Sequence, residues 1–417
     1  MKRHIKINKL ASIVMLLLAA LSSGTLFQAC EKSDSGGGAP PVVNYIRISD
    51  PTKSDSLVTS AFMGSTIAIM GENLQDVNQV WFNDQKAYIN SSFVTGTTII
   101  ITIPNHIPGV VTNQIYIITT NTQDTLKVPF NVVVPAPRLD AMYEEYVPAG
   151  GIAVIMGNFF IDDPGSPLKV FFPGNIEGEV KNVTIDEIQV KVPEGAGVGP
   201  IQVKTIYGST RSAFYFRDDR GMVLNYDNLN TAGSWRGGTI KNDANSLDRN
   251  YLVLKGTLGD NAGAEDFAGG GFVSELWGDA NGRPSGNLFT GDPADYLFKF
   301  EANVVSWTGA YLNICWGPWA SSVGPYQNQL YWSDMNARGL WKAWETTGKG
   351  SFKTVGWMTV TIPMTEMKYT KGPAFGPMVF DKAKAGSLTF WMNGPAATTG
   401  GDSQIEIYID NVRIVHK

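Results

Sequence analysis

Short segments in which apolar and polar residues alternate make up most of the chain after its first forty residues. The segment Ile405–Val415 alternates in period two, which is typical of a strand with one buried and one wet face. Similar runs recur between Gly, Pro and Asn turns, and no long helical periodicity stands out. In the C-terminal half they cover residues 251–254, 296–305, 311–316, 357–362 and 387–392. The pattern predicts an all-β fold.

Two stretches of the chain, residues 41–135 and 136–218, show the same signals in the same order. In each, a strand leads into a glycine, at Gly71 and Gly157, and a Val-x-Phe strand follows. Each stretch later ends a strand in proline and adds one more strand after a Gly turn. We expect both glycines to adopt a positive φ, which residues with a β-carbon disfavour. The repeat predicts two similar β-sandwiches in tandem.

The order of these signals resembles the TIG/IPT immunoglobulin-like fold over most of residues 41–218. Such modules usually act as spacers, and the alternative is that one of them binds a partner itself. The segment Pro135-Ala136-Pro137 would form a stiff link between them, because proline fixes φ. The remaining residues, 219–417, are most simply a larger β-sandwich of jelly-roll type.

The N-terminal residues have the pattern of a targeting signal. A basic segment precedes the apolar run Leu10–Leu21, which is too short to span a bilayer and fits a signal peptide. Ala29 before Cys30 resembles a bacterial lipobox, in which Cys30 is acylated; the alternative is an ordinary secretory signal cleaved near Ala29. We therefore expect a lipid-anchored, surface-exposed outer-membrane protein. The expected parts are a signal peptide at 1–29, a flexible tether at 30–41, immunoglobulin-like domains at 42–135 and 136–218, and a C-terminal domain at 219–417.

Composition and charge exclude several classes of function. Charged residues make up only 17% of the chain, the formal net charge is -5, and no Lys/Arg run could follow a phosphate backbone. Three histidines and two cysteines cannot build a zinc cluster or a disulfide framework. Cys315 lies in an apolar run and is interpreted as a buried thiol. No cofactor is expected.

Aromatic residues point to the ligand. Residues 219–417 hold 10 of the 11 tryptophans, many of them among Gly, Pro, Asn and Gln. The apolar face of a pyranose stacks on an indole or phenol, and a neutral polysaccharide needs no basic cluster. Trp307, Trp316 and Trp357 lie in strand-like runs and are expected in the core. The candidate glycan-binding residues are Trp277, Asn313, Trp319, Tyr326, Tyr331, Trp332, Trp341 and Trp391.

Other chemistry is less well supported. A glycoside hydrolase or lyase would need a carboxylate pair, for which Asp260, Glu265, Asp266, Glu275, Asp279 and Glu345 are available. A protein-binding adhesin would use the same aromatic residues as an interface. Asp410 beside Asn411 could support a structural Ca²⁺, although a turn at the end of a strand is favoured.

The layout as a whole resembles the Bacteroidetes surface glycan-binding proteins of type B, lipoproteins at the SusE/SusF position beside SusC/SusD-like transporters. The segments Trp341–Trp344, Gly356–Pro363 and Ile407–Val412 look like parts of their C-terminal domain. The resemblance implies a non-catalytic lipoprotein that holds polysaccharide for hydrolysis and import. It also implies a β-glucan or xyloglucan-like ligand on an aromatic platform in the C-terminal domain.

Overall fold

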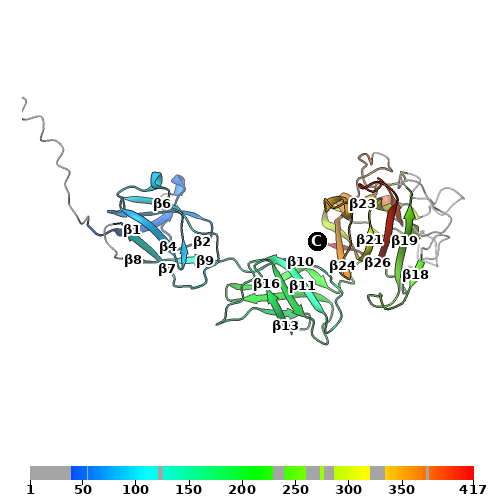
Figure 1. Ribbon diagram of the computed structural model, residues 1–417, viewed down its shortest axis with the longest axis horizontal. Coiled ribbons are helices and arrows are strands. Elements are labelled where there is room, and N and C mark those ends of the chain that lie inside the picture. The colour runs from blue at the N-terminus through cyan, green and yellow to red at the C-terminus, as the bar shows by residue number, and fades with distance from the viewer. Residues whose placement is uncertain are drawn as a thin grey trace, which may run out of the picture. The chain divides into compact units, whose positions relative to one another are not determined.

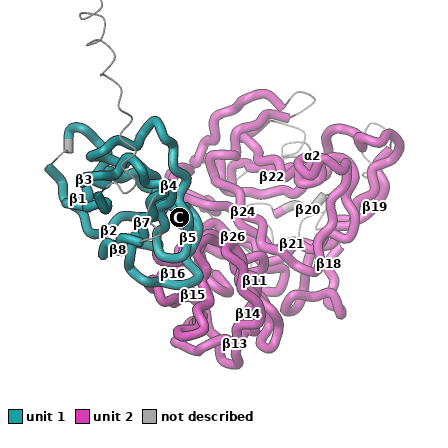
Figure 2. The backbone as a smooth tube through the Cα atoms, turned by 60° about the vertical axis from the view of Figure 1, so that its left-hand side comes forward, with its two compact units in different colours: residues 1–134 teal, residues 135–417 magenta. Residues whose placement is uncertain are grey.

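The computed structural model describes residues 39–53, 55–120, 125–228, 239–259, 273–276, 286–319, 334–371 and 375–417. The signal segment and Cys30 lie outside these ranges. Almost all regular structure is strand, which confirms the all-β class (Figure 1). No helix among the described residues has the length and apolar character needed to cross a membrane. The chain divides into two compact units, residues 1–134 and 135–417 (Figure 2).

The first unit is a β-sandwich. One sheet has the order β1-β3-β6 and the other β5-β4-β7-β8, while β2 and β9 pair in parallel. Inward-facing Ile, Val and Phe side chains form one core between the sheets, including Ile69, Val80 and Ile117. The strands are β1 Val42–Ile48, β2 Ser60–Phe62, β3 Thr66–Glu72, β4 Val77–Phe82, β5 Gln85–Lys86, β6 Thr98–Thr102, β7 Gln114–Thr119, β8 Thr125–Pro129 and β9 Asn131–Val133.

The second unit begins with another β-sandwich, which repeats the pattern of the first. Its strands follow the order β10-β11-β14-β13-β12-β15-β16 around a core that includes Ile155, Phe172 and Val203. The strands are β10 Arg138–Met142, β11 Ile152–Asn158, β12 Lys169–Phe172, β13 Ile176–Val183, β14 Glu187–Lys191, β15 Gly199–Thr205 and β16 Gly208–Phe216.

The prediction of a positive φ at Gly71 and Gly157 is wrong. Both glycines lie within strands, β3 and β11, and neither has a positive φ. A Cβ at either position would come within 1.9 Å of a carbonyl oxygen on the neighbouring strand, so close approach of two backbones requires glycine there. The positive φ belongs to the residue two places further on, Asn73 at 57° and Phe159 at 60°.

The C-terminal domain is a two-sheet sandwich. One sheet has the order β18-β19-β26-β21-β24, with β17 also paired to β26, and the other has the order β20-β25-β22-β23. A large core that includes Phe298, Trp316 and Ile407 lies between them. The elements are β17 Met222–Leu224, β18 Thr239–Lys241, β19 Tyr251–Leu258, β20 Val273–Leu276, β21 Tyr296–Trp307, β22 Tyr311–Gly317, β23 Gly339–Trp341, α2 Ala343–Thr346, β24 Trp357–Pro363, β25 Ser387–Asn393 and β26 Ser403–His416.

Strand β26 differs from the prediction of one wet face. From Tyr408 to Val415 every side chain is buried on both faces. Asp410 and Asn411 lie inside this strand, not in a turn at its end, and Asn411 has a φ of 48° where the pairing with β21 shifts register. No group of three or more His, Cys, Asp or Glu side chains in the described part of the chain is placed to hold a metal ion.

Candidate functional site

The four-stranded sheet of the C-terminal domain organises the region in which the candidate aromatic residues occur. Along β22, the side chains of Leu312, Ile314 and Trp316 join the core, as the alternation predicted. Cys315 points the other way and is buried, which confirms the interpretation as a buried thiol. This sheet therefore turns one face to the core and carries Asn313 and Cys315 on the other.

Asn313 is a structural residue, so the prediction that it contacts glycan is wrong. Its side chain is fully buried. The Nδ2 group donates to the carbonyl oxygens of Tyr311, Trp391 and Asn393 at 3.0, 3.2 and 2.9 Å. Its Oδ1 accepts a hydrogen bond from the guanidinium of Arg338 at 3.3 Å. Because the side chain is fully buried and both its nitrogen and its oxygen bond to neighbouring groups, Asn313 fixes the outer face of the sheet and is out of reach of a sugar hydroxyl.

Trp341 and Trp391 are also buried, and their assignment to an exposed platform is wrong. Trp341 lies in β23 directly opposite Leu312, on the core face. Its ring packs edge-on against Trp307 at 4.8 Å between centroids. Trp391 is only 2% exposed on β25, and the guanidinium carbon of Arg338 lies 5.8 Å from the centre of its ring. Trp341 lies in a strand of three residues, which no alternating run predicts, whereas Trp391 lies in the predicted run 387–392 and is buried on the face turned away from the core.

The three tryptophans expected in the core are there. Trp307, Trp316 and Trp357 are at most 7% exposed. Trp344 is buried as well, and its indole N–H donates to the carbonyl oxygen of Ala310. Burial of this many indoles shows that the core of the C-terminal domain takes more of the Trp enrichment than the sequence suggested.

Among the candidate aromatic residues that the structure describes, Trp319 is the one that is partly exposed. It lies two residues after the end of β22, and its backbone lies so close to Gly386 that a Cβ on Gly386 would be 2.3 Å from the Trp319 nitrogen. Gly386 therefore sets where the chain leaves the sheet. The remaining candidates lie outside the described residues: Trp277, Tyr326, Tyr331 and Trp332.

The sheet nevertheless places the ends of β20 and β22, after which the segments with Trp277 and Trp319 begin, on either side of β25. Leu276, the last residue of β20, and Trp316, near the end of β22, are both paired with Leu388 of β25. Because β20 and β22 are each antiparallel to β25, they run parallel to one another and end at the same edge of the sheet. The chain that carries Trp277 and the chain that carries Trp319 therefore leave from one edge. We call this end of the sheet, defined by Leu276 and Trp316, the aromatic edge.

The opposite end of β22 carries a polar group. The hydroxyl of Tyr311 donates to Glu345 Oε1 at 2.7 Å, and Lys342 Nζ lies 3.6 Å from the second oxygen of that carboxylate. Burial, together with this hydrogen bond, raises the pKa of Tyr311. Glu345 is thus engaged by two partners, which is a poor arrangement for a free catalytic acid.

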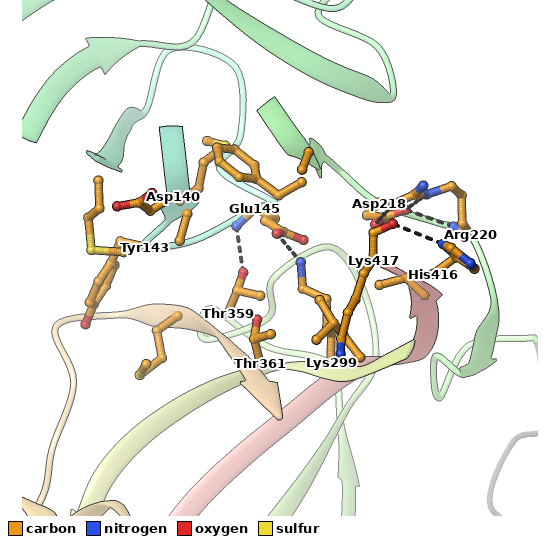
Figure 3. A pocket seen from close by; sticks show the side chains of 18 residues that line it. Asp140, Tyr143, Glu145, Asp218, Arg220, Lys299, Thr359, Thr361, His416 and Lys417 are labelled. Carbon is orange, nitrogen blue, oxygen red and sulfur yellow. Dashed lines mark hydrogen bonds and ion pairs between the residues drawn. The ribbon is translucent and has the colours of Figure 1, made fainter. Parts of the chain in front are cut away.

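A cavity of about 340 Å³ lies elsewhere in the second unit (Figure 3). Residues of the second sandwich, such as Met142 and Phe214, line it together with C-terminal residues such as Leu297 and Met358. Its lining combines Met142, Met156 and Met358 with charged side chains such as Asp218, Arg220 and Lys299, and it contains none of the tryptophans expected of a sugar platform.

Beside this cavity lies a buried ion network that joins the two domains. Glu145 of the second sandwich accepts from Lys299 and from Arg413, the latter at 2.7 Å, and Arg413 also donates to Glu301 at 2.7 Å. The backbone N–H of Glu145 donates to Thr359 Oγ1 at 2.8 Å. Burial raises the pKa of Glu301 and lowers that of Lys299, in each case partly opposed by an opposite charge. Each charged group of this network therefore lies beside at least one group of opposite charge.

Comparison with known proteins agrees with this architecture. The model of the surface glycan-binding protein B xyloglucan-binding domain matches residues 216–416, and the IPT/TIG domain model matches residues 52–129. The solved surface glycan-binding protein PbSGBP-B from Prevotella bryantii has a TM-score of 0.76 at 26% identity, over 91% of this chain and 99% of that chain.

Two further relatives are more distant or cover less. An IPT/TIG domain-containing protein of Bacteroides ovatus is 34% identical over 139 residues, which are 32% of this chain and only 28% of that protein. The SGBP-B of a xyloglucan utilization locus in Bacteroides uniformis has a TM-score of 0.45 at 17% identity, over 91% of this chain and 100% of that chain. Residues 216–416 belong to the family of the surface glycan-binding protein B xyloglucan-binding domain, and a TIG domain precedes them in the chain.

Proposed function

We propose that the C-terminal domain binds a neutral β-glucan or xyloglucan-like polysaccharide through aromatic residues at the aromatic edge. The observation that carries this proposal is the shared edge from which the Trp277 and Trp319 segments leave the sheet. The match of residues 216–416 to a xyloglucan-binding domain supports the ligand class. An exposed aromatic ring can stack on the apolar face of a pyranose, and no basic cluster is needed for an uncharged chain.

Affinity electrophoresis of the full chain tests this. Gels would contain xyloglucan, mixed-linkage β-glucan, laminarin, galactomannan or xylan. Retardation in the xyloglucan or mixed-linkage gel is expected, and Trp319→Ala should reduce it. Phe62→Ala removes an aromatic side chain that is 58% exposed in the first unit, and serves as the matched control. Retardation in none of the gels would overturn the proposal.

We also propose that the protein is non-catalytic. The pairing of Glu345 with Tyr311 and Lys342 supports this, because that carboxylate already serves two partners. Prolonged incubation with the retarding glycan should release no reducing ends. Release that survives repurification, and is lost in Glu345→Gln, would instead assign a hydrolase.

The proposed site of action is the outer surface of the cell, with Cys30 as the lipid anchor and a SusC/SusD-like transporter as the neighbour that takes up the glycan. The lipobox-like Ala29-Cys30 pair supports the anchor. Cys30→Ser should move the protein from the membrane fraction to the soluble one, whereas Cys315→Ser should not. Retention of Cys30→Ser in the membrane fraction would contradict the anchor.

A further inference from the structure

A row of four side chains crosses one sheet of the first unit. Trp81 of β4 is paired with Lys86 of β5 on one side and with Tyr116 of β7 on the other. Tyr116 is in turn paired with Lys127 of β8. Directly opposed residues of antiparallel strands point to the same face. The row therefore reads Lys86, Trp81, Tyr116, Lys127 across the whole width of the sheet, and we call it the Lys-Trp-Tyr-Lys row.

This row lies on the solvent face. Its neighbours along the strands, Val80, Phe82, Ile115 and Ile117, are buried in the core on the other face. Both aromatic side chains of the row are partly exposed and both lysines are exposed.

The groups of the row contact one another. Lys86 Nζ lies 5.8 Å from the centre of the Trp81 ring, and Lys127 Nζ lies 6.0 Å from that of Tyr116. The Trp81 indole N–H donates to Gln79 Oε1 at 3.1 Å, which orients the ring.

The second sandwich shows that the fold does not require these residues. The equivalent strands place Phe171 opposite Glu177 and Gln202, and Gln202 opposite Arg211. The same four positions therefore read Glu, Phe, Gln, Arg. The aromatic pair and the two like charges belong to the first unit alone among these two repeats. Trp81 is also the single tryptophan before residue 218.

The chemistry of the row suits a sugar chain that carries negative charge. Two rings side by side, about one strand spacing or ~4.8 Å apart, offer adjacent apolar surfaces for successive pyranose rings. The two lysines stand about three strand spacings apart, roughly 14 Å, and can pair with carboxylates on either side of the stacked rings. Two exposed like charges flanking an aromatic pair complement an anionic ligand better than a neutral one.

We propose that the Lys-Trp-Tyr-Lys row is a second glycan site, which binds a polysaccharide bearing uronate carboxylates. The site lies in the first compact unit, whereas the proposed neutral-glycan site lies in the second. The two proposals can therefore be tested independently of one another.

The test uses the full chain and polygalacturonate in affinity gels at low and at 0.5 M salt. The double variant Trp81→Phe with Tyr116→Gln copies the aromatic positions of the second sandwich, which folds with those residues. It should weaken polygalacturonate binding about tenfold or more. Lys86→Gln with Lys127→Gln should also weaken it and remove most of its salt dependence, because screening acts on exposed charges. Phe62→Ala is the control aromatic variant and should bind as the wild type does.

The outcomes separate the parts of the proposal. Absence of polygalacturonate binding by the wild-type chain overturns it, and so does binding that the aromatic double variant leaves unchanged. Equal binding of neutral galactan, unaffected by the lysine variant, overturns the uronate assignment. Retardation by xyloglucan should stay the same in all three variants, since it reports on the other unit.

Discussion

At the scale of single residues, burial decides function more than residue type does. Asn313 and Trp391 are the kinds of residue that bind sugars, but they lie opposite each other in adjacent strands and bond to their own sheet. Both lie in the strand-like runs 311–316 and 387–392, but the local sequence does not show that Arg338 and the neighbouring strands bury the face on which they lie. The core tryptophans were predictable because they sit in long apolar runs. The platform residues were not, because their place depends on loops.

Asp410 gives a prediction at this scale. Burial, with the charge of Asp248 as the next cause, raises its pKa from 3.8 to about 9. The folded state therefore holds this proton between about pH 4 and 9, where the unfolded state has lost it, so stability falls as pH rises through that window. Asp410→Asn keeps an acceptor for the Asn411 N–H without the charge. The variant should melt at a higher temperature than the wild type at pH 8 and at a similar one at pH 4.5.

Thermal unfolding followed by tryptophan fluorescence checks this, because 10 of the 11 tryptophans lie in residues 219–417. Asp402→Asn removes a carboxyl group from an exposed position of the same domain and controls for net charge. A gap between Asp410→Asn and the wild type that stays constant with pH would contradict a buried, protonated carboxyl.

At the scale of elements, strand positions were largely predictable and their surroundings were not. The runs that alternate or stay apolar became β19, β21, β22, β24, β25 and β26. The expected wet face of β26 is buried because Arg413 and its neighbours meet the second sandwich, a contact between residues 268 apart in sequence. The repeat predicts that Gly71 and Gly157 are required, but for a positive φ, whereas the structure requires them because two strand backbones approach closely there.

The network around Arg413 gives the prediction for this scale. Arg413→Ala would leave Glu145 and Glu301 buried without their shared cation, which typically costs about 3–5 kcal/mol of stability. Arg138→Ala removes an arginine from an exposed pair with Asp140 in the same unit and should change stability little. Urea unfolding followed by tryptophan fluorescence measures both. Similar midpoints for the two variants would show that the buried network contributes no more than a surface pair.

At the scale of the whole molecule, the second sandwich belongs with the C-terminal domain in one compact unit. The resemblance suggested two spacers of equal standing, and sequence could not reveal the difference because Glu145 becomes informative only once Arg413 and Lys299 lie beside it. The two copies of the tandem repeat therefore have different structural roles. Each copy has a core of its own, but the second also shares a buried network with the C-terminal domain.

A truncation tests this division. A fragment of residues 219–417 lacks Glu145 and leaves Lys299 and Arg413 with one carboxylate, Glu301, between them. It should therefore melt at a lower temperature than a fragment of residues 135–417 in the same buffer. Equal melting temperatures would mean that the interface adds nothing to the stability of the C-terminal domain. Binding assays are accordingly better made on the full chain than on residues 219–417.

The central claim is that neutral glycan binds at the aromatic edge of the C-terminal domain. Isothermal titration calorimetry of the full chain with xyloglucan oligosaccharide, comparing the wild type with the Trp277→Ala and Trp319→Ala double variant, tests it most directly. Loss of two stacking contacts of about 1 kcal/mol each predicts an affinity lower by at least tenfold, with the unfolding midpoint unchanged. An affinity equal to that of the wild type would contradict the account.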